Sequence, residues 1–283
     1  MNYSIIGIGQ AGCAITTLFS NFPEHYNKFY RIDTEEQVKK ENCIDIHLVR
    51  QPKPEDYEKV SNLKKHFKKL NSDVLFIVAG GGNVSLSSLA ILEQIKDKTN
   101  ISVLYIRPDI EFLGAEGKLK EKTTFNIFQE YARSGLFKRL YIVSNIEIEK
   151  AMGGVSIISY YEKINETILS TFHMMNVFQK MKPVTSTFSD LPIGTRISTI
   201  GLIDVDSKEE KMFFNLDLPT DSVYYFAYNE VALKEDVKLL NHIKNMIRNK
   251  VEIGVARVSY GIYATSYDRE FIIVANHTSF LQN

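Results

Sequence analysis

Residues 4–16 read SIIGIGQAGCAIT, and the spacing of their glycines decides the fold. Gly7, Gly9 and Gly12 spell GxGxxG directly after a short apolar run, the pattern of a strand, a tight turn and a helix that bind a dinucleotide. Asp33 follows at about the distance expected for an acid that binds a ribose. Taken alone, the stretch predicts an NAD-dependent oxidoreductase.

A second glycine-rich stretch argues against that interpretation. AGGGNVS, residues 79–85, follows the apolar run VLFIV. Glycines at a strand end let main-chain N–H groups approach phosphate oxygens, and the N-terminus of the following helix favours negative charge. A dinucleotide fold needs only the first stretch, so the pair favours a mononucleotide with a polyphosphate tail. The alternative is that the glycines only allow helices to pack closely against strands.

Composition argues against several other classes of protein. The 283 residues include 34 basic and 34 acidic side chains, so the net charge gives no reason to expect nucleic acid or an anionic membrane as a partner. The two cysteines and six histidines are scattered, and we expect neither a metal site nor a disulfide. We expect no signal peptide, and no apolar run approaches the ~20 residues of a membrane span. We therefore expect a cytoplasmic protein.

The first half of the chain alternates apolar strands with helices, which predicts a parallel, doubly wound α/β sheet. The predicted strands are residues 3–9, 28–33, 46–50, 74–82, 101–108 and 140–145. The predicted helices are residues 11–22, 56–70, 86–98 and 123–135.

The rest of the chain has a different pattern. Apolar residues spaced by three and four predict one long central helix, apolar on more than one face and ended by Pro183. A smaller α+β domain follows, with one helix over 232–249 and strands over 198–205, 211–218, 222–230, 258–268 and 270–279. The expected layout is a Rossmann-like nucleotide domain over 1–153, the central helix over 154–182 and a second domain over 183–283.

In their order and spacing these stretches resemble the tubulin/FtsZ superfamily. GQAGCAI (9–15) resembles the first loop of tubulins, and VLFIVAGGGNVSLSSLAILEQIK (74–96) aligns without a gap against the glycine-rich loop and helix of FtsZ. Further segments resemble FtsZ, so the likeness covers nearly the whole chain: KFYRIDTEEQ (28–37), IRPDIEFLGAEGKLK (106–120), LYIVSNIEIEK (140–150) and SYGIYATSYDREFIIVANHTS (259–279). The resemblance implies a tubulin/FtsZ-like fold that binds GTP or GDP, with Mg²⁺ accompanying GTP. The lack of an acidic or linker tail suggests a divergent member, such as a phage or plasmid protein.

The resemblance also implies which residues would contact the phosphates. Gln10 would lie near the terminal phosphate and Mg²⁺. The main-chain N–H groups that would bind the phosphates belong to Gly9, Ala11, Gly12, Gly80, Gly81, Gly82, Asn83, Val84 and Ser85.

A second group of residues would contact the sugar and the base. Glu116 and Lys120 match the sugar-contacting acid and base of the family. Asn145 and Asn165 would read the guanine edge, because an amide can pair with both its acceptor and its donors. Tyr161 would stack on the ring. The alternative for Tyr161 is a core aromatic on a buried helix.

In this family a loop after the long helix carries an acid to the nucleotide of the next subunit, where it orients water for hydrolysis. FSDL, within residues 183–191, places Asp190 at 25 residues after Asn165, which is the family spacing. GLIDVDSKEE (201–210) looks similar but begins 36 residues after Asn165, so Asp204, Asp206 and Glu209 are not expected to act. The alternative for Asp190 is a helix N-cap or a solvated loop acid.

Two loops depart from the family pattern. GGGNVSL carries Val84 and Leu86 where the family has glycine, and the third loop reads RQPKP, so Arg50 or Lys53 would supply charge in place of N–H groups. Three functions therefore stay open. The first is a GTPase that assembles into head-to-tail filaments, with hydrolysis at the subunit interface. The second is a degenerate structural relative with weak or no nucleotide binding, and the third is the NAD-dependent oxidoreductase.

Overall fold

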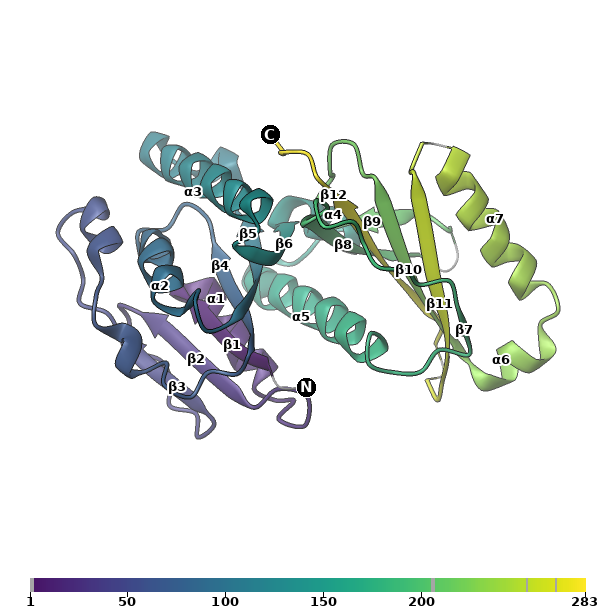
Figure 1. The fold of residues 1–283 in the computed structure, drawn as a ribbon, viewed down its shortest axis with the longest axis horizontal. Coiled ribbons are helices and arrows are strands. Elements are labelled where there is room, and N and C mark those ends of the chain that lie inside the picture. The colour runs from purple at the N-terminus through teal and green to yellow at the C-terminus, as the bar shows by residue number, and fades with distance from the viewer. Residues whose placement is uncertain (1–2, 205–206, 253, 268) are drawn as a thin grey trace.

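A computed structural model describes residues 3–204, 207–252, 254–267 and 269–283. In these ranges one twisted sheet of twelve strands runs through the whole molecule, with helices on both faces (Figure 1). Its strand order is β3-β2-β1-β4-β5-β6-β8-β12-β10-β11-β7, and β9 pairs with β8 outside this path.

The first six strands form the predicted parallel, doubly wound sheet. All neighbouring pairs among β1 to β6 are parallel. α1 packs on one face of this sheet and α2 and α3 on the other, each face with its own apolar core. The elements are β1 (Tyr3–Ile8), α1 (Gly9–Phe19), β2 (Lys28–Asp33), β3 (Cys43–His47), β4 (Asp73–Ala79), α2 (Ser88–Ile95), β5 (Asn100–Arg107), α3 (Ala115–Ser134), β6 (Phe137–Ser144) and α4 (Asn145–Met152).

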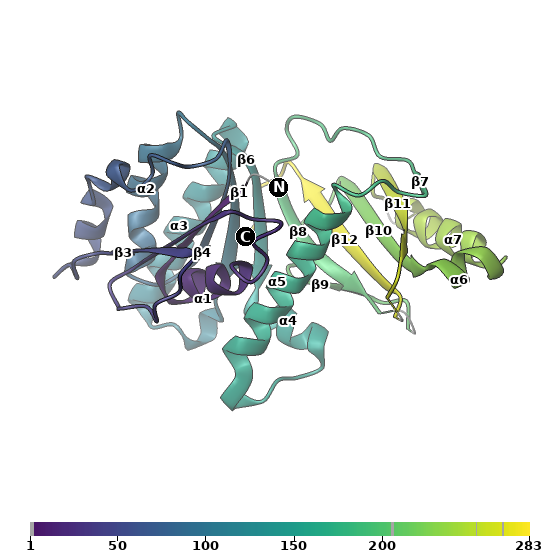
Figure 2. The same cartoon turned by 90° about the horizontal axis from the view of Figure 1, so that it is seen from below.

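The central helix α5 (Tyr160–Phe178) lies between the two halves of the molecule (Figure 2). At about 1.5 Å per residue it is about 28 Å long. Phe172 packs edge-on against Phe19 of α1, with ring centroids 6.3 Å apart, and Phe178 packs against Tyr263 of the second half, with centroids 4.6 Å apart. The helix is thus apolar on more than one face, as predicted. It is shorter than residues 154–182, since a 3₁₀ turn (Ile157–Ser159) precedes it and the chain is irregular after Phe178.

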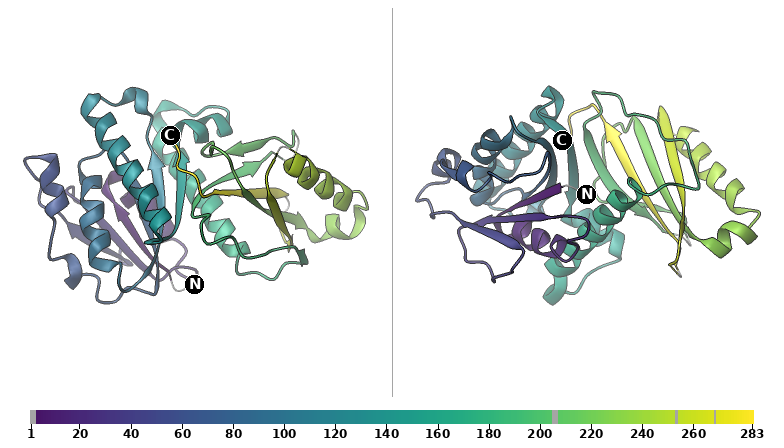
Figure 3. Two further views of the ribbon diagram at one scale, coloured as in Figure 1. Left: turned by 45° about the horizontal axis from the view of Figure 1, so that its top comes forward. Right: turned by 60° about the horizontal axis from the view of Figure 1, so that its bottom comes forward.

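The second half continues the same sheet with mostly antiparallel strands. β8 joins β6 through two parallel residue pairs, Leu140–Ile197 and Tyr141–Ser198. The helices α6 and α7 cover the outer face at the far end (Figure 3). The elements are β7 (Thr185–Ser186), β8 (Ile197–Ile203), β9 (Glu210–Met212), β10 (Asp221–Asn229), α6 (Glu230–Glu235), α7 (Leu239–Glu252), β11 (Arg257–Thr265) and β12 (Phe271–Thr278).

Three predicted elements are wrong. Residues 56–70 contain only the 3₁₀ turns Pro54–Lys59 and Leu63–Lys65, because Asn62 adopts a left-handed φ of 66° between them. The helix over 232–249 is two helices, because Asp236 is extended and ends α6. The strand over 211–218 is shortened to the three residues of β9.

Among the described residues, no helix combines the length and the apolar character needed to cross a membrane.

Candidate nucleotide site

The first glycine-rich turn joins β1 to α1 and exposes main-chain N–H groups. Gly9 begins α1 with φ +67°, a conformation that side chains with a Cβ rarely adopt. Ile8 precedes it and provides no capping side chain, so the first N–H groups of α1 have no side-chain acceptor. Gln10 lies exposed in this first turn and Ala11 is half-buried. This arrangement suits a phosphate.

Two other glycines of the GxGxxG pattern are required by packing. A Cβ on Gly7 would overlap the carbonyl oxygen of Gly12, and a Cβ on Gly12 would lie 2.5 Å from the carbonyl oxygen of Ile77 in β4. The close approach of α1 to β1 and β4 therefore depends on both. Close packing of the helix against the strands therefore explains the glycines at positions 7 and 12. At position 9, glycine is favoured by the positive φ of the backbone.

The second glycine-rich turn lies beside the first. A Cβ on Gly9 would lie 3.9 Å from Cβ of Val84, which starts the 3₁₀ turn Val84–Ser87 after β4. Gly81 has φ +81°, and Ser85 closes the turn by donating its hydroxyl to the carbonyl of Ala79. The two predicted phosphate loops thus meet at the carboxyl edge of neighbouring strands, where ligands bind in open α/β sheets.

Not every N–H group of the second turn is free for a phosphate. The N–H of Gly80 donates to the carbonyl of Ile106 at 3.0 Å, so it extends the pairing of β4 with β5. Val84 does not need a left-handed backbone, since the positive φ values near this turn are those of glycines. The turn therefore accommodates Val84 without strain, although the family has glycine at this position.

The predicted sugar contacts lie against the same turn. Lys120 of α3 donates to the side-chain oxygen of Asn83 and forms an ion pair with Glu116, one helical turn earlier. A network of one loop side chain and two helix side chains therefore flanks the glycine-rich turn.

The predicted base contacts are side chains without partners. Oδ1 of Asn145, the first residue of α4, is buried and accepts no hydrogen bond in the described part of the chain. The side chain of Asn165, which is 9% exposed, also has no hydrogen-bond partner among the described residues. A buried acceptor without a donor lowers the free energy of unfolding by about 1–3 kcal/mol, so such groups are uncommon in folded proteins and call for an explanation.

Tyr161 is not a core aromatic. Its side chain is 69% exposed, and its ring touches the edge of Tyr160 with centroids 5.2 Å apart. Tyr161 and Asn165 lie four residues apart on α5 and so share one face of the helix. An exposed ring one helical turn from the unpartnered amide of Asn165 suits a planar base with hydrogen-bonding edges.

Comparisons with known proteins bear on this arrangement. No family model and no curated protein matches the sequence. Among solved structures, TubZ of Bacillus thuringiensis serovar israelensis in a GTPγS-form protofilament matches with a TM-score of 0.70 at 15% identity, over 100% of this chain and 87% of that one. CetZ2 of Haloferax volcanii in a GTPγS-bound protofilament matches with 0.70 at 15%, over 98% and 92%. An empty FtsZ dimer of M. jannaschii matches with 0.69 at 12%, over 98% and 88%.

The chain shares the fold of TubZ, CetZ2 and FtsZ.

The remaining predicted residues take different places in this tubulin/FtsZ-like fold. Asp33, at the end of β2, is buried and accepts the N–H of Thr34 at 2.7 Å, so its carboxylate contacts its own chain. Arg50 forms an ion pair with Glu35. Asp33 and Arg50 both lie at the sheet edge that carries the glycine-rich turns, and a nucleotide contact by either stays a prediction.

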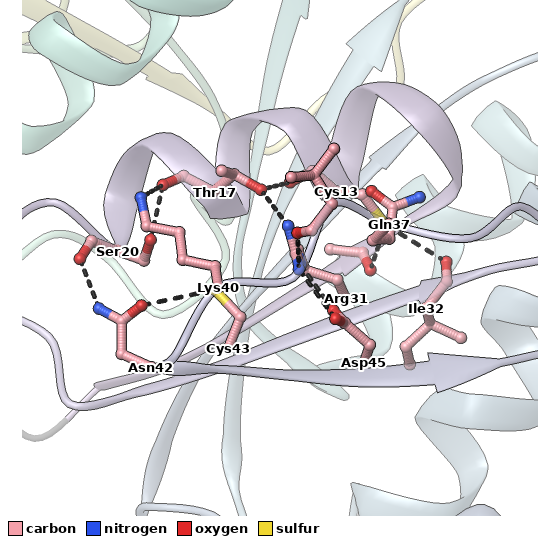
Figure 4. A network of polar contacts seen from close by, with 12 residues as sticks. Cys13, Thr17, Ser20, Arg31, Ile32, Gln37, Lys40, Asn42, Cys43 and Asp45 are labelled. Atoms are coloured by element: carbon pink, nitrogen blue, oxygen red, sulfur yellow. Dashed lines mark hydrogen bonds and ion pairs between the residues drawn. The ribbon is translucent and has the colours of Figure 1, made fainter.

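A network of hydrogen bonds holds the segment between β2 and β3 against β2 and α1 (Figure 4). Arg31 is 2% exposed and binds both carboxylate oxygens of Asp45, at 2.7 and 2.9 Å. It also donates to the Thr17 hydroxyl at 3.0 Å and to the carbonyl of Val38 at 2.9 Å. Burial raises the pKa of the nearby Cys13 thiol to about 12, so this cysteine is a buried packing residue.

Asp190 lies at the other end of α5. It is exposed on the segment after β7 and borders a cavity of about 730 Å³ near Tyr3, Ser102 and Arg139, which stand at the amino ends of β1, β5 and β6. This is the edge of the sheet opposite to the glycine-rich turns. The structure thus separates Asp190 from the other predicted site residues of the same chain.

The similar stretch at 201–210 occupies a different place. Residues 201–203 belong to β8, Asp204 accepts the N–H of Ser207 at 2.9 Å, and Glu209 accepts the N–H of Asp204 at its carbonyl. Asp206 lies outside the described residues.

The sequence did not indicate that Tyr105, Leu113 and Glu121 pack against the second glycine-rich turn. A Cβ on Gly80 would meet Tyr105 and Glu121, and a Cβ on Gly81 would meet Leu113. Glu121 stands in the stretch KLKEKTT, whose charges suggest an exposed helix face, so nothing in the sequence marked it as buried.

Proposed function

We propose that this chain binds guanine nucleotides and assembles with further copies of itself into head-to-tail filaments. The observation that carries the proposal is the group of Asn145, Asn165 and Tyr161: two unpartnered amides and an exposed ring on neighbouring helices. The solved relatives support it, since TubZ and CetZ2 were found as protofilaments bearing GTPγS.

Different groups of residues would bind the base, the sugar and the phosphates of the nucleotide. The amides of Asn145 and Asn165 would bind the guanine edge, Tyr161 would cover its face, and Glu116 and Lys120 would hold the sugar. The exposed N–H groups at Gly9 and at the second turn would bind the phosphates, with Gln10 beside the last one. Mg²⁺ would accompany the phosphates of GTP, as it does where a protein binds it through a nucleotide.

Apolar side chains at both ends of the molecule support assembly. Ile157 and Ile158, just before α5, are 94% and 99% exposed at the nucleotide end. Val184 and Ile193, on either side of Asp190, are 65% and 83% exposed at the other end. Different surfaces that meet head to tail do not close into a ring unless a rotation closes them, so an open filament follows. In it Asp190 would reach the nucleotide of the neighbouring copy and orient a water for hydrolysis.

Titration and sedimentation test the proposal. Calorimetry with GTP, GDP, ATP and NAD should show preference for the guanine nucleotides, and pelleting with electron microscopy should show filaments that depend on GTP. Preferential binding of NAD would restore the oxidoreductase alternative and reject the proposal.

A degenerate structural protein is the second candidate. The N–H of Gly80 is already bound, and Val84 and Leu86 stand where the family has glycine. This candidate predicts filaments that form equally with GTP, with GDP and without nucleotide.

A further inference from the structure

The second glycine-rich turn rests on a buried cluster that the nucleotide contacts do not include. A Cβ on Gly80 would overlap the hydroxyl of Tyr105 and lie 3.0 Å from Cγ of Glu121. Gly80 does not have a positive φ, so its neighbours and not its backbone require a glycine there. Tyr105 of β5 and Glu121 of α3 therefore leave no room for a side chain at Gly80.

Glu121 is itself held by a single cation. It is 2% exposed, and its Oε1 accepts from Nε of Arg107 at 3.1 Å. The guanidinium carbon of Arg107 lies 4.5 Å from the centre of the Phe125 ring, on the same helix as Glu121. Desolvation raises the pKa of Glu121, and Arg107 opposes this effect. A buried ion pair of this kind tolerates little displacement, because a charge that loses its partner stays desolvated.

The same arginine also contacts the last residues of the described chain. Nη1 of Arg107 donates to the main-chain oxygen of Asn283 at 2.7 Å. Gln282, 4% exposed, exchanges two hydrogen bonds with Gln129 of α3: its N–H donates to Oε1 at 2.6 Å, and its carbonyl accepts from Nε2 at 3.1 Å. Segment 279–283 thus binds both Arg107 and Gln129 of α3.

We propose that Tyr105, Arg107 and Glu121 are positioning residues for the second glycine-rich turn. We also propose that segment 279–283, which binds Arg107 and α3, stabilises their arrangement. The proposal rests on nucleotide binding at that turn. Because binding and docking then favour the same arrangement of α3, each strengthens the other to the same degree.

The first experiment removes the charge of Glu121 and keeps its shape. Glu121→Gln should speed amide hydrogen exchange at residues 80–85 of the nucleotide-free protein and weaken GTP binding, each by about ten-fold. Glu130→Gln is the matched control, because Glu130 lies on the same helix but is exposed, 3.4 Å from Arg133. The control should behave as the wild type. A folded Glu121→Gln variant with wild-type exchange in the turn would overturn the proposal.

The second experiment asks why position 80 is a glycine. The residue is needed either for packing against Tyr105 and Glu121 or for the close approach of a phosphate. Gly80→Ala should weaken GTP binding, and adding Tyr105→Phe should recover part of the loss, because it removes the hydroxyl that the new Cβ overlaps. Gly114→Ala is the control, since its Cβ would meet no atom within 4 Å. If the double variant binds as poorly as Gly80→Ala alone, the glycine serves the ligand and the packing role is wrong.

The third experiment tests the role of segment 279–283. GTP should slow hydrogen exchange at residues 279–283, and Gln129→Ala should weaken GTP binding. Unchanged exchange in the segment upon GTP binding would reject its part in the proposal. A wild type that binds no GTP would reject the proposed function, and the exchange of residues 80–85 in Glu121→Gln would still decide whether Glu121 positions the turn.

Discussion

At the scale of one residue, Asn145 is a buried polar group without a hydrogen-bond partner among the described residues. Its Oδ1 is enclosed where β6 turns into α4, yet no donor of the described chain reaches it. Burial of such an acceptor lowers the stability of the free protein, and a donor from a ligand restores it.

Replacement of Asn145 should therefore separate stability from binding. Asn145→Ala should leave the melting temperature of the nucleotide-free protein unchanged or higher, because the unsatisfied oxygen is gone. The rise in melting temperature caused by GDP should be lost, corresponding to about 1–3 kcal/mol. Asn100→Ala, at an exposed asparagine of β5, is the control and should keep that rise. Full GDP stabilisation in Asn145→Ala would mean that the amide does not contact the base.

Tyr161 carries the second prediction at this scale. Tyr161→Ala should weaken GTP binding by about 1–3 kcal/mol in a calorimetric titration, the usual worth of a base stacked on an aromatic ring. The melting temperature should not fall, because the ring is 69% exposed. Tyr267→Ala, which removes a tyrosine 51% exposed in the second half, should bind as the wild type. Unchanged affinity in Tyr161→Ala would remove the ring from the site.

At the scale of elements, the contact between α1 and α5 contains a histidine that resists protonation. His173 of α5 is stacked on Phe22 with centroids 4.2 Å apart, and its Nδ1 lies 3.2 Å from the Tyr26 hydroxyl. Desolvation, and secondly the charge of His25, lower its pKa from 6.5 to about 4. The folded protein keeps this ring neutral in a pH range where the unfolded chain protonates it.

This histidine should make stability depend on pH. Above pH 6.5, the ordinary pKa of histidine, His173 is neutral in both the folded and the unfolded protein and does not reduce stability. As the pH falls from 6.5 toward about 4, the unfolded chain binds a proton at His173 that the folded protein does not bind, so the free energy of unfolding decreases. Urea unfolding from pH 7 to 4.5 should therefore show a loss of about 1–3 kcal/mol in the wild type that His173→Gln lacks. His25→Gln, at a more exposed ring, should retain most of the loss. Equal slopes for the wild type and His173→Gln would contradict this origin.

The sequence predicted these elements unevenly, for physical reasons. β2 matches its predicted bounds, residues 28–33, because its aromatic and β-branched residues Phe29, Tyr30 and Ile32 favour a buried strand. Residues 56–70 did not form a helix, because Gln94 of α2 accepts the N–H groups of Leu63 and Lys64 that a helix would use. Tertiary hydrogen bonds of this kind leave no local pattern.

The candidate site was predictable only in part for the same reason. Glycine spacing marks both turns, because a tight turn and a close approach restrict the residue type. The support of the second turn by Glu121 depends on where α3 packs, which spacing does not encode.

At the scale of the whole molecule, α5 separates the two groups of residues that the proposed hydrolysis needs. The predicted base and phosphate contacts lie at one edge of the sheet and Asp190 at the other, so one chain cannot bring them together. The proposed hydrolysis therefore requires assembly.

Replacement of Asp190 should abolish GTP hydrolysis and leave GTP binding intact. Asp190→Ala filaments should last longer than those of the wild type, whose turnover should rise faster than linearly with protein concentration. Asp204→Ala and Glu209→Ala are the controls and should hydrolyse at the wild-type rate. Phosphate release that is linear in protein concentration and indifferent to Asp190 would reject hydrolysis between neighbours.

A charge at the nucleotide end should block assembly. Ile158→Lys should fold normally, since the side chain is 99% exposed, and should bind GTP but form no pellet, because the lysine would be desolvated in the contact. Val237→Lys, 86% exposed beyond α6, is the matched control and should pellet as the wild type. Filaments of Ile158→Lys at the wild-type concentration would place the contact elsewhere.

The junction of β6 with β8 has a mechanical consequence. It comprises two residue pairs, whereas β5 with β6 and β8 with β12 comprise seven each. In the proposed filament, tension would bend the sheet most easily at this seam, since few hydrogen bonds span it. The C-terminal half of α5 bridges the seam, because Phe172 packs against Phe19 of α1 and Phe178 packs against Tyr225 of β10 and Tyr263 of β11. These ring contacts, more than strand pairing, would carry the load between the two halves of the molecule.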